Sequence, residues 1–364
     1  MLAPHKLEKS MTGQSASRKD RENEMLACDV SPDSPSGCEA RGRLNDAAQW
    51  QARSMIARQG AAPKIEKKLM AMALGLLLGL PGLARADITF TFTTIDVPLP
   101  PPAPPNTLSS RTAADANSAN AIAGEYDDLV GATHGFIVSG STYTTIDVPN
   151  ASSTTINGIN APGQLTGTYQ DSSGGFHAFF SPSQGVFTTL TPPGSVRAQG
   201  GFLNSQGQTV GTYRTSDQKR HGFLWSRGAF IMTPFNVPND DPLFGTVVFG
   251  INDLGQIVGD YVDATDQNRH GFLLSQGTYT KPLDPPGSTL TVAEGINNAG
   301  VIVGVYLDAN GQHGFLLKNG VYTQVDVPGS TATEINSINP QGRIVGYYID
   351  KNGSTHGFVG TPAD

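Results

Sequence analysis

The chain has 364 residues, of which 15% are charged, 43 are glycine and 25 are proline. From Asp87 onward it carries 11 Lys and Arg against 22 Asp and Glu, so this part is strongly acidic. Nucleic acid and anionic lipid bind basic surfaces, and we therefore expect neither as a partner. The length would allow two or three domains, but the internal repeat described below indicates one domain behind an N-terminal leader.

The leader consists of two parts. Residues 1–69 are polar and charged with no apolar periodicity, which indicates a disordered extension or a start codon annotated too early. The basic segment Lys64–Lys68 then leads into the apolar run Leu69–Leu83, which ends in Ala84-Arg85-Ala86. These features predict a secretory signal peptide with its core and cleavage site in residues 70–86 and a true start near Met55.

The leader also bears on the compartment. Its apolar run is too short to span a membrane comfortably, so we expect no membrane insertion after the signal is removed. Both cysteines, Cys28 and Cys38, precede the predicted cleavage site, and the mature chain therefore needs no disulfide. We expect a secreted protein, periplasmic or extracellular.

Residues 87–364 are predicted to form one repeat domain. The first extended run, Phe90–Pro98, is followed by the proline-rich segment Pro98–Pro105, which we interpret as a stiff spacer. From there to Gly360 the chain consists of copies of one unit, in which successive histidines are 43, 44, 49, 43 and 43 residues apart.

Each unit contains the same markers in the same order. An Asn-x-x-Gly turn comes first, at Asn160, Asn204, Asn252, Asn297 and Asn339, with a degenerate copy at Asn117–Asn120. Gly-x-Tyr follows, at Tyr126, Tyr169, Tyr213, Tyr261, Tyr306 and Tyr348. An Asp comes two residues later, at Asp128, Asp171, Asp263, Asp308 and Asp350, with Thr215 as the exception. His-Gly-Phe or His-Ala-Phe begins at His134, His177, His221, His270, His313 and His356. The unit ends in a strand that finishes at Asp96, Asp147, Asp284 and Asp326, with Thr191 and Asn236 in the other two copies.

These markers separate four short extended runs, for example TVAEGIN, VIVGVYLD, HGFLL and VYTQVDVP. Four strands in a period of 40–50 residues are typical of a β-propeller blade. The array begins with a fourth strand alone, Phe90–Pro98, and stops after a third strand, His356–Gly360. We therefore predict an all-β fold, a six-bladed β-propeller of four-stranded blades, with the ring closed by the N-terminal strand joining the C-terminal three.

The Asp and His of each unit flank one hairpin turn. In the tightest copy, a two-residue Asn310-Gly311 turn would place Asp308 directly across from His313. We interpret the pair as a hydrogen-bonded clasp, in preference to six metal or proton-transfer sites, because one Asp–His pair offers too few ligands for zinc. The loops at Asp308–Gly311 and Asp350–Gly353 resemble calcium loops but lack the third acidic position and the distal Glu.

The glycine and tyrosine of Gly-x-Tyr are interpreted as packing positions. A glycine in the strand leaves space for a ring on the neighbouring strand, for which the Phe of His-Gly-Phe is the expected occupant. The tyrosine hydroxyls are expected to find hydrogen-bond partners at the blade edges.

Sequence signatures of catalysis are missing: we find no Gly-x-Ser-x-Gly, no phosphate-binding loop and no His-Glu-x-x-His. A glycosidase pair needs only spatial proximity, so it can hide among the acidic residues. The predicted mature chain has three glutamates, Glu125, Glu294 and Glu334, and the last two lie in first strands that are candidates to face the central channel.

Units three and four depart from the repeat. The fourth has an insertion around Asn239–Val248 and a longer turn at Asp263–Arg269, and the third carries extra basic residues at Arg214, Lys219, Arg220 and Arg227. Loops that vary on a regular scaffold are where binding specificity is usually found, although neutral drift in loop length is the simpler explanation of these two.

The pattern Gly-Ile-Asn-x-x-Gly-x-Ile-Val-Gly-x-Tyr-x-Asp followed by His-Gly-Phe resembles the bacterial extracellular HAF repeats, whose His-Ala-Phe is found here at His177–Phe179. The pattern covers nearly the whole chain after Asp87, with departures at Asn117–Asn120 and Leu203-Asn204. The resemblance implies a secreted or cell-envelope repeat protein and supplies no catalytic residues.

We therefore predict an exported binding or interaction module of the bacterial envelope, a monomer with an unknown glycan or protein ligand at the channel mouth or on the loops of units three and four. No catalytic, cofactor-binding or metal-ligating residue is assigned, and calcium is the one cofactor kept in view. The alternatives are a propeller-type carbohydrate hydrolase or lyase and a structural or adhesive surface protein.

Overall fold

The computed structural model describes residues 88–98, 108–109 and 113–363. The chain divides into two units, 1–72 and 73–364, and every described residue belongs to the second. The predicted extension and signal peptide, and all but the first residue of the proline-rich segment, lie outside the described residues. Within the described part, no helix is long and apolar enough to cross a membrane.

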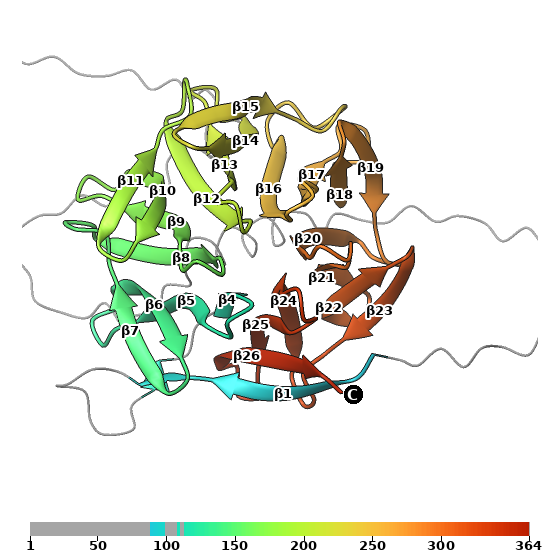
Figure 1. The fold of residues 1–364 in the computed structure, drawn as a ribbon. Helices are drawn as coiled ribbons and strands as arrows, with labels where there is room; N and C mark the ends of the chain where they lie inside the picture. Colours follow the sequence, from blue (N-terminus) through green and yellow to red (C-terminus); the bar gives the residue numbers. More distant parts are fainter. Residues whose placement is uncertain (1–87, 99–107, 110–112, 364) are drawn as a thin grey trace, which may run out of the picture. The chain divides into compact units, whose positions relative to one another are not determined.

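The described residues form antiparallel sheets arranged around a central axis (Figure 1). The first sheet contains β4 (Ala113–Ala116), β5 (Ile122–Asp127), β6 (Thr133–Ser139) and β7 (Thr142–Ile146). The second contains β8 (Ser153–Ile159), β9 (Leu165–Gln170), β10 (Phe176–Ser183) and β11 (Val186–Leu190). The third contains β12 (Arg197–Leu203), β13 (Thr209–Arg214), β14 (Arg220–Ser226) and β15 (Ala229–Phe235).

The second half of the ring repeats this order. The fourth sheet contains β16 (Thr246–Ile251), β17 (Ile257–Val262), β18 (Arg269–Ser275) and β19 (Thr278–Leu283). The fifth contains β20 (Leu290–Ile296), β21 (Ile302–Asp308), β22 (Gly311–Lys318) and β23 (Val321–Val325). The sixth contains β24 (Ala332–Ile338), β25 (Ile344–Ile349) and β26 (Thr355–Pro362). The short strands β2 (Val97–Pro98) and β3 (Leu108–Ser109) pair with each other.

The sixth sheet takes its fourth strand from the other end of the chain. β1 (Phe90–Ile95) pairs antiparallel with β26, from Phe90 opposite Pro362 to Ile95 opposite Gly357. Figure 1 shows β1, in cyan, lying beside β26, in red. The fold is thus the predicted β-propeller with six four-stranded blades, and the predicted strand exchange is present.

The turns between first and second strands have the predicted geometry. The fourth residue of each turn has a positive φ, for example +83° at Gly163 and +81° at Gly342. In each of these turns the backbone N–H of the fourth residue donates to the carbonyl of the Asn, as from Gly163 to Asn160 at 2.9 Å. In the degenerate first copy Asn120 takes this place with φ +63°, a conformation that Asn tolerates better than most residues.

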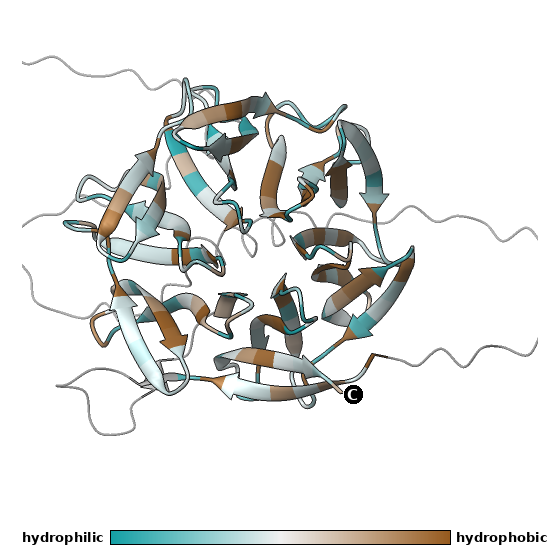
Figure 2. Ribbon diagram, viewed as in Figure 1, coloured by the Kyte–Doolittle hydropathy of each residue, from teal (hydrophilic) through white to brown (hydrophobic). Residues whose placement is uncertain are grey.

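The core lies between neighbouring blades. The Phe of every His-Gly-Phe or His-Ala-Phe motif is at most 2% exposed, and each apolar cluster joins two adjacent sheets. A Cβ added to Gly167 would lie 2.9 Å from the ring of Phe179 on the next strand, so the predicted glycine–phenylalanine packing is confirmed. Figure 2 shows hydrophobic colour on the inner strand β16, while the outermost strands β1 and β7 are mostly pale.

The repeated tyrosines are anchored at the blade edge, as predicted. Five of the six hydroxyls bond to side chains of the fourth strand, for example Tyr126 to Thr145 at 2.9 Å and Tyr169 to Thr189 at 3.0 Å. Each of the six tyrosine rings also packs on the histidine of its own unit, with ring centroids 5.0 to 5.6 Å apart.

Candidate functional site

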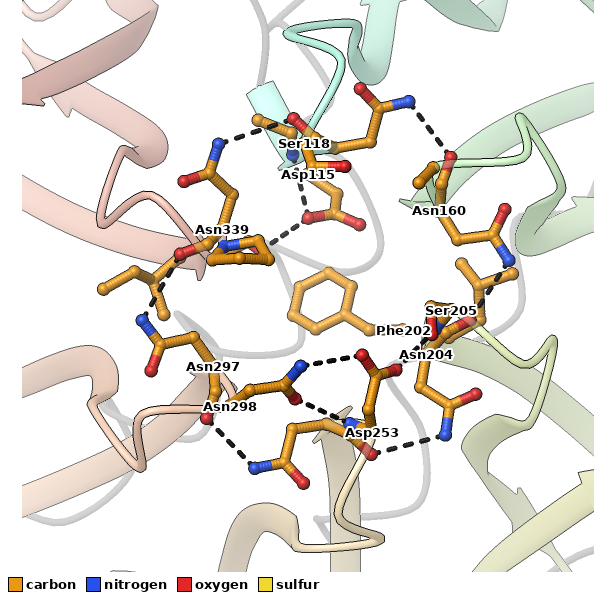
Figure 3. Close-up of a pocket in the computed structure, with 18 of the residues that line it drawn as sticks. Asp115, Ser118, Asn160, Phe202, Asn204, Ser205, Asp253, Asn297, Asn298 and Asn339 are labelled. Carbon is orange, nitrogen blue, oxygen red and sulfur yellow. Dashed lines mark hydrogen bonds between the residues drawn. The ribbon is translucent and has the colours of Figure 1, made fainter.

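A closed circle of hydrogen bonds surrounds the axis where the first strands end. The amide of each repeated Asn donates to the backbone carbonyl of the Asn in the next blade (Figure 3), with distances of 3.0 to 3.4 Å. The members are Asn117, Asn160, Asn204, Asn252, Asn297 and Asn339. The last bond runs from Asn339 back to Asn117, so the first and last blades are joined at the axis as well as at β1.

The side-chain oxygen of each repeated Asn accepts hydrogen bonds from backbone N–H groups of its own turn. The side-chain oxygen of Asn252 accepts from the backbone N–H of Leu254 at 3.1 Å and of Gln256 at 3.0 Å. One side chain therefore acts as donor to the next blade and as acceptor within its own blade. Asp has the acceptor and lacks the donor, which explains why these positions are Asn.

Inside this circle lies a cavity of about 110 Å³. Its walls come from all six blades, and the residue two positions before the Asn lines it in three of them, as Asp115, Phe202 and Ser337. That position is glycine in three units, at Gly158, Gly250 and Gly295, but Phe202 in the third. Figure 3 shows the ring of Phe202 in the middle of the opening, with its face turned along the axis.

Polar side chains form the rim of this cavity. We call the cavity together with its rim the amide mouth. The carboxylate of Asp253 accepts from the backbone N–H of Ser205 at 2.8 Å and from the amide of Asn298 at 2.7 Å. The Asn298 oxygen accepts in turn from the backbone N–H of Asp253 at 2.9 Å. Although burial raises it, these hydrogen bonds hold the pKa of Asp253 below its usual value, so the mouth carries one fixed negative charge there.

A second carboxyl group lines the mouth from the first blade. Asp115 is 7% exposed and accepts from the backbone N–H groups of Ala116 and Ile159 and from the hydroxyl of Ser337. Burial raises the pKa of Asp115 to about 6, against the opposing effect of these three hydrogen bonds. This carboxyl therefore changes its charge in the mildly acidic range.

A different set of charges gathers at the opposite end of the first strands. The guanidinium of Arg269 donates to both oxygens of Asp260, at 2.8 Å and 2.6 Å, and Asp260 is 1% exposed. Burial lowers the pKa of Arg269, but Asp260, Glu294 and Glu334 together hold it above its usual value. Both glutamates that the sequence placed near the channel thus lie in one network with Arg269, each about 5% exposed.

Glu334 also accepts two hydrogen bonds from neighbouring side chains. It accepts from the hydroxyl of Tyr347 at 2.8 Å and from the amide of Gln312 at 3.4 Å. Burial and the charge of Glu334 raise the pKa of Tyr347 well above its usual value, so this phenol stays protonated. The third glutamate, Glu125, is 9% exposed on β5 of the first blade.

The predicted Asp–His contacts are present in four blades, and the other two blades differ. His134, His177, His313 and His356 lie 2.7 to 3.6 Å from the predicted Asp. In the fourth blade the partner is Asp266 at 3.1 Å and not Asp263, because Asp263 bonds to Thr265 within the longer turn. In the third blade Thr215 takes the carboxylate's place at 3.3 Å from His221.

The predicted register of the tightest hairpin is wrong. Asp308 lies opposite Gly311, and His313 lies opposite Tyr306, because the connecting residues are Ala309 and Asn310. The side chains of Asp308 and His313 still approach to 3.6 Å across this offset.

The other imidazole nitrogen has a partner that the sequence did not reveal. In four blades it bonds to the Asp at the end of the fourth strand, as from His270 to Asp284 at 2.6 Å and from His313 to Asp326 at 2.8 Å. Each such imidazole therefore bridges two carboxylates and ties three strands together, which supports a structural role.

The two loops that resemble calcium loops are closed by their own backbones. The Asp308 carboxylate accepts from the N–H of Asn310 at 2.6 Å, and that of Asp350 accepts from Asn352 and Ser354 at 2.8 Å. Among the described residues, no group of three or more His, Cys, Asp or Glu side chains is placed to hold a metal ion. Calcium binding by these loops stays a prediction.

The variable loops of units three and four are joined to each other. Lys219 forms an ion pair with Asp240 at 3.0 Å, and Gln267 bonds to Asp241 at 3.0 Å. The insertion presents Leu243 and Phe244, which are 54% and 41% exposed. Of the extra basic residues, Arg227 lies in an exposed turn, whereas Arg214 and Arg220 are half-buried in strands.

Phe202 was not singled out from the sequence. Its signal is the replacement of Gly-Ile-Asn, found in three units, by Gly-Phe-Leu-Asn in the third. In the sequence this change only makes the third copy of the repeat a poorer match to the pattern. The structure shows that the phenylalanine lines the cavity at the axis, where all six turns meet.

No protein-family model matches this chain, and no curated protein sequence is similar to it. Solved structures resemble it, and two of them are described as β-propellers. The lectin of Aleuria aurantia, described as six-bladed, is 13% identical and matches 70% of this chain and 95% of the lectin with a TM-score of 0.45. AofleA from Arthrobotrys oligospora is 12% identical over 76% of this chain and 88% of its own, with a TM-score of 0.49. The β-propeller domain of the Trilobed protease from Pyrococcus furiosus is 8% identical over 69% and 93%, with a TM-score of 0.41. At these identities the likeness concerns the fold alone.

Proposed function

We propose that this chain is an exported binding module of the HAF-repeat type, and that its amide mouth holds one sugar unit of a glycan. The observation that carries the proposal is the ring of Phe202, which lies within a polar rim at a position where three other blades have glycine.

The chemistry of the mouth suits a sugar. One face of a pyranose ring is a set of C–H groups, which packs on an aromatic ring, while its hydroxyl groups bond to amides and carboxylates. The mouth offers both kinds of group within one cavity, namely the face of Phe202 and the side chains of Asp253, Asn298 and Ser205. A cavity of about 110 Å³ is small, so it favours the end of a chain over an internal segment.

The decisive variant is Phe202→Gly. Because three other blades have glycine at this position, the fold tolerates it, and the variant removes only the ring. We expect the purified protein to gain thermal stability with at least one member of a panel of bacterial and plant glycans. Phe202→Gly should weaken that binding about fivefold or more, since one aromatic contact contributes about 1 kcal/mol beyond its buried area.

Phe244→Ala is the matched control, because it removes an exposed ring from the insertion of the fourth unit. Equal glycan affinity in the wild type and Phe202→Gly, or no glycan response at all, would overturn the proposal. If no glycan binds, a protein ligand or a structural role becomes the better explanation of the fold. The same panel should include calcium, which tests the two loops that resemble calcium loops.

A carbohydrate hydrolase or lyase is the second candidate. It is favoured by the carboxylates of Asp260, Glu294 and Glu334, whose charges act on Arg269, and by the protonated Tyr347, which donates to Glu334. Chain cleavage during incubation, detected as new reducing ends or unsaturated products and lost in Glu334→Gln, would replace the binding module by an enzyme.

A further inference from the structure

The lining of the amide mouth is acidic. Of the described residues that line it, two are carboxylic acids, Asp115 and Asp253, and none is Lys, Arg or His. Arg343, which follows the Asn turn of the sixth blade, donates to the side chain of Asn120 and is not one of the lining residues. A ligand in the mouth therefore meets negative charge, and no positive side chain of the lining offsets it.

The scaffold does not require either carboxyl group. At the position of Asp253, one after the repeated Asn, the other units have a neutral residue, namely Ser118, Ala161, Ser205, Asn298 or Pro340. At the position of Asp115, two before the repeated Asn, three units have glycine, the third has Phe202 and the sixth has Ser337. Both acids are thus departures from the repeat, and the structure brings them together at the axis with a third departure, Phe202.

The two carboxyl groups point into the opening. In the view of Figure 3 they lie on opposite sides of the ring of Phe202, with Asp115 reaching in from the first blade and Asp253 from the fourth. Asp253 accepts from Ser205 at one oxygen and from Asn298 at the other. A carboxylate has about four acceptor positions, so these bonds hold the group in place and leave it able to accept from a ligand.

The ring of Phe202 is half-buried and lies outside the apolar core. Its neighbour Leu203 packs in the cluster between the second and third blades, of which Phe202 is not a member. The face of an aromatic ring attracts the C–H groups of a pyranose and also a nearby ammonium group. An amine on a sugar is attached at the edge of the pyranose ring, so a sugar stacked on Phe202 carries its amine toward the rim, where Asp253 lies.

We infer that the sugar held by the amide mouth is a protonated amino sugar, a hexosamine whose free ammonium group bonds to Asp253 beside Phe202. The inference rests on the proposed function and adds the charge by which the mouth distinguishes sugars. A hydrogen bond between two charged groups is about twice as strong as one between neutral groups. Asp115, whose pKa burial raises to about 6, is mostly ionised at neutral pH and adds a second negative charge. An N-acetylated sugar lacks the positive charge and a sugar acid has the opposite one, so both should bind more weakly.

The test measures the binding of matched sugars to the purified protein by calorimetry at pH 7 and low ionic strength. The probes are the methyl glycosides of an amino sugar, its N-acetylated form, the parent hexose and the corresponding uronic acid, each in the gluco and galacto series. We expect the amino sugar to bind about tenfold more tightly than its N-acetylated form and the uronic acid to bind most weakly. Added salt should narrow the difference, because it screens the charges.

The variant for this test is Asp253→Asn, which introduces the residue that the fifth blade has at this position and so keeps the turn. It should bind the amino sugar about tenfold more weakly and the N-acetylated sugar as the wild type does. A purely structural role of Asp253 would weaken both. Asp217→Asn is the control, because it removes the same charge from an exposed turn at the other end of β13, and it should bind both sugars as the wild type does.

The outcomes separate this inference from the proposed function. An amino sugar that binds no more tightly than its N-acetylated form, or an equal loss of both in Asp253→Asn, would overturn the inference and leave a neutral sugar as the ligand. The same holds if none of these sugars binds while another glycan of the wider panel does. No response to any sugar or glycan would overturn both.

Discussion

The hydroxyl of Ser337 in the last blade donates to the carboxyl group of Asp115 in the first, at 2.5 Å across 222 positions of the chain. The other oxygen of Asp115 accepts from the backbone N–H of Ile159 in the second blade at 2.9 Å. One buried carboxyl therefore joins three blades, at the point where the ring of blades closes.

The stability of the ring should depend on the ionisation of Asp115. Its pKa is raised to about 6, whereas an unfolded carboxyl titrates near 4. Its contribution is thus fully present below about pH 4 and is lost as the pH rises through about 6. The loss is on the order of 3 kcal/mol in the free energy of unfolding.

Asp115→Asn isolates this effect, because the other carboxylates titrate equally in both proteins. Urea unfolding at pH 4 and pH 7 should show that the wild type loses stability relative to Asp115→Asn as the pH rises. A difference between the two proteins that is the same at both pH values would contradict the raised pKa.

The circle of asparagines makes a second prediction. Asn297→Asp replaces the amide donor that points at the Asn339 carbonyl, 3.3 Å away, with an oxygen that repels it. The free energy of unfolding should fall by about 1–3 kcal/mol, the usual cost of a buried polar group without a partner. Asn319→Asp, in an exposed turn, is the control, and an equal effect of the two substitutions would show that the circle does not stabilise the ring.

The histidine bridges predict a second pH dependence, which comes from a stabilised positive charge on an imidazole and not from a buried neutral carboxyl group. Burial lowers the pKa of His270, but Asp284 and Asp266 outweigh it and hold the value above 6.5. A base with a raised pKa adds stability that is present below about pH 6.5 and lost as the pH rises through the folded value.

Titration of the imidazole signals by NMR should therefore show a lower pKa for His270 in Asp284→Asn than in the wild type. Asp326→Asn removes the equivalent partner of His313 in the fifth blade and should leave the His270 titration unchanged. If Asp284→Asn also leaves it unchanged, the imidazole owes its pKa to other groups.

The strand exchange at β1 predicts an effect on stability far from any ligand. The ring of Phe92 packs edge-on against Phe358, with centroids 5.5 Å apart. Phe92→Ala should cost about 1–3 kcal/mol, less than the full value for a buried ring because Phe92 is only half-buried. Thr93→Ala, on the exposed side of the same strand, should change stability by less than about 0.5 kcal/mol.

Deletion of residues 87–98 should lower the melting temperature by many degrees, because it removes the fourth strand of the sixth blade. An unchanged melting temperature would show that β1 is dispensable.

The sequence by itself determined the blades. Strand identity depends on alternation and on short-range turn chemistry, so the Asn-x-x-Gly turns, the glycine facing Phe179 and the exchange of β1 could all be predicted from local patterns. Two local details could not be predicted from the sequence. The register at Asp308 and His313 depends on which two residues form the turn. The pairing of His270 with Asp266, in place of Asp263, depends on the path of a longer loop.

Only the tertiary structure decided what the six units build together. The Asn side chains could be predicted to make turns, but their bonds to the next blade exist only when six turns meet at one axis. Phe202 occupies that axis alone because its counterparts in the other blades are small or polar. Contacts of this kind join residues separated by a whole repeat or more, and no local pattern encodes the distance between them.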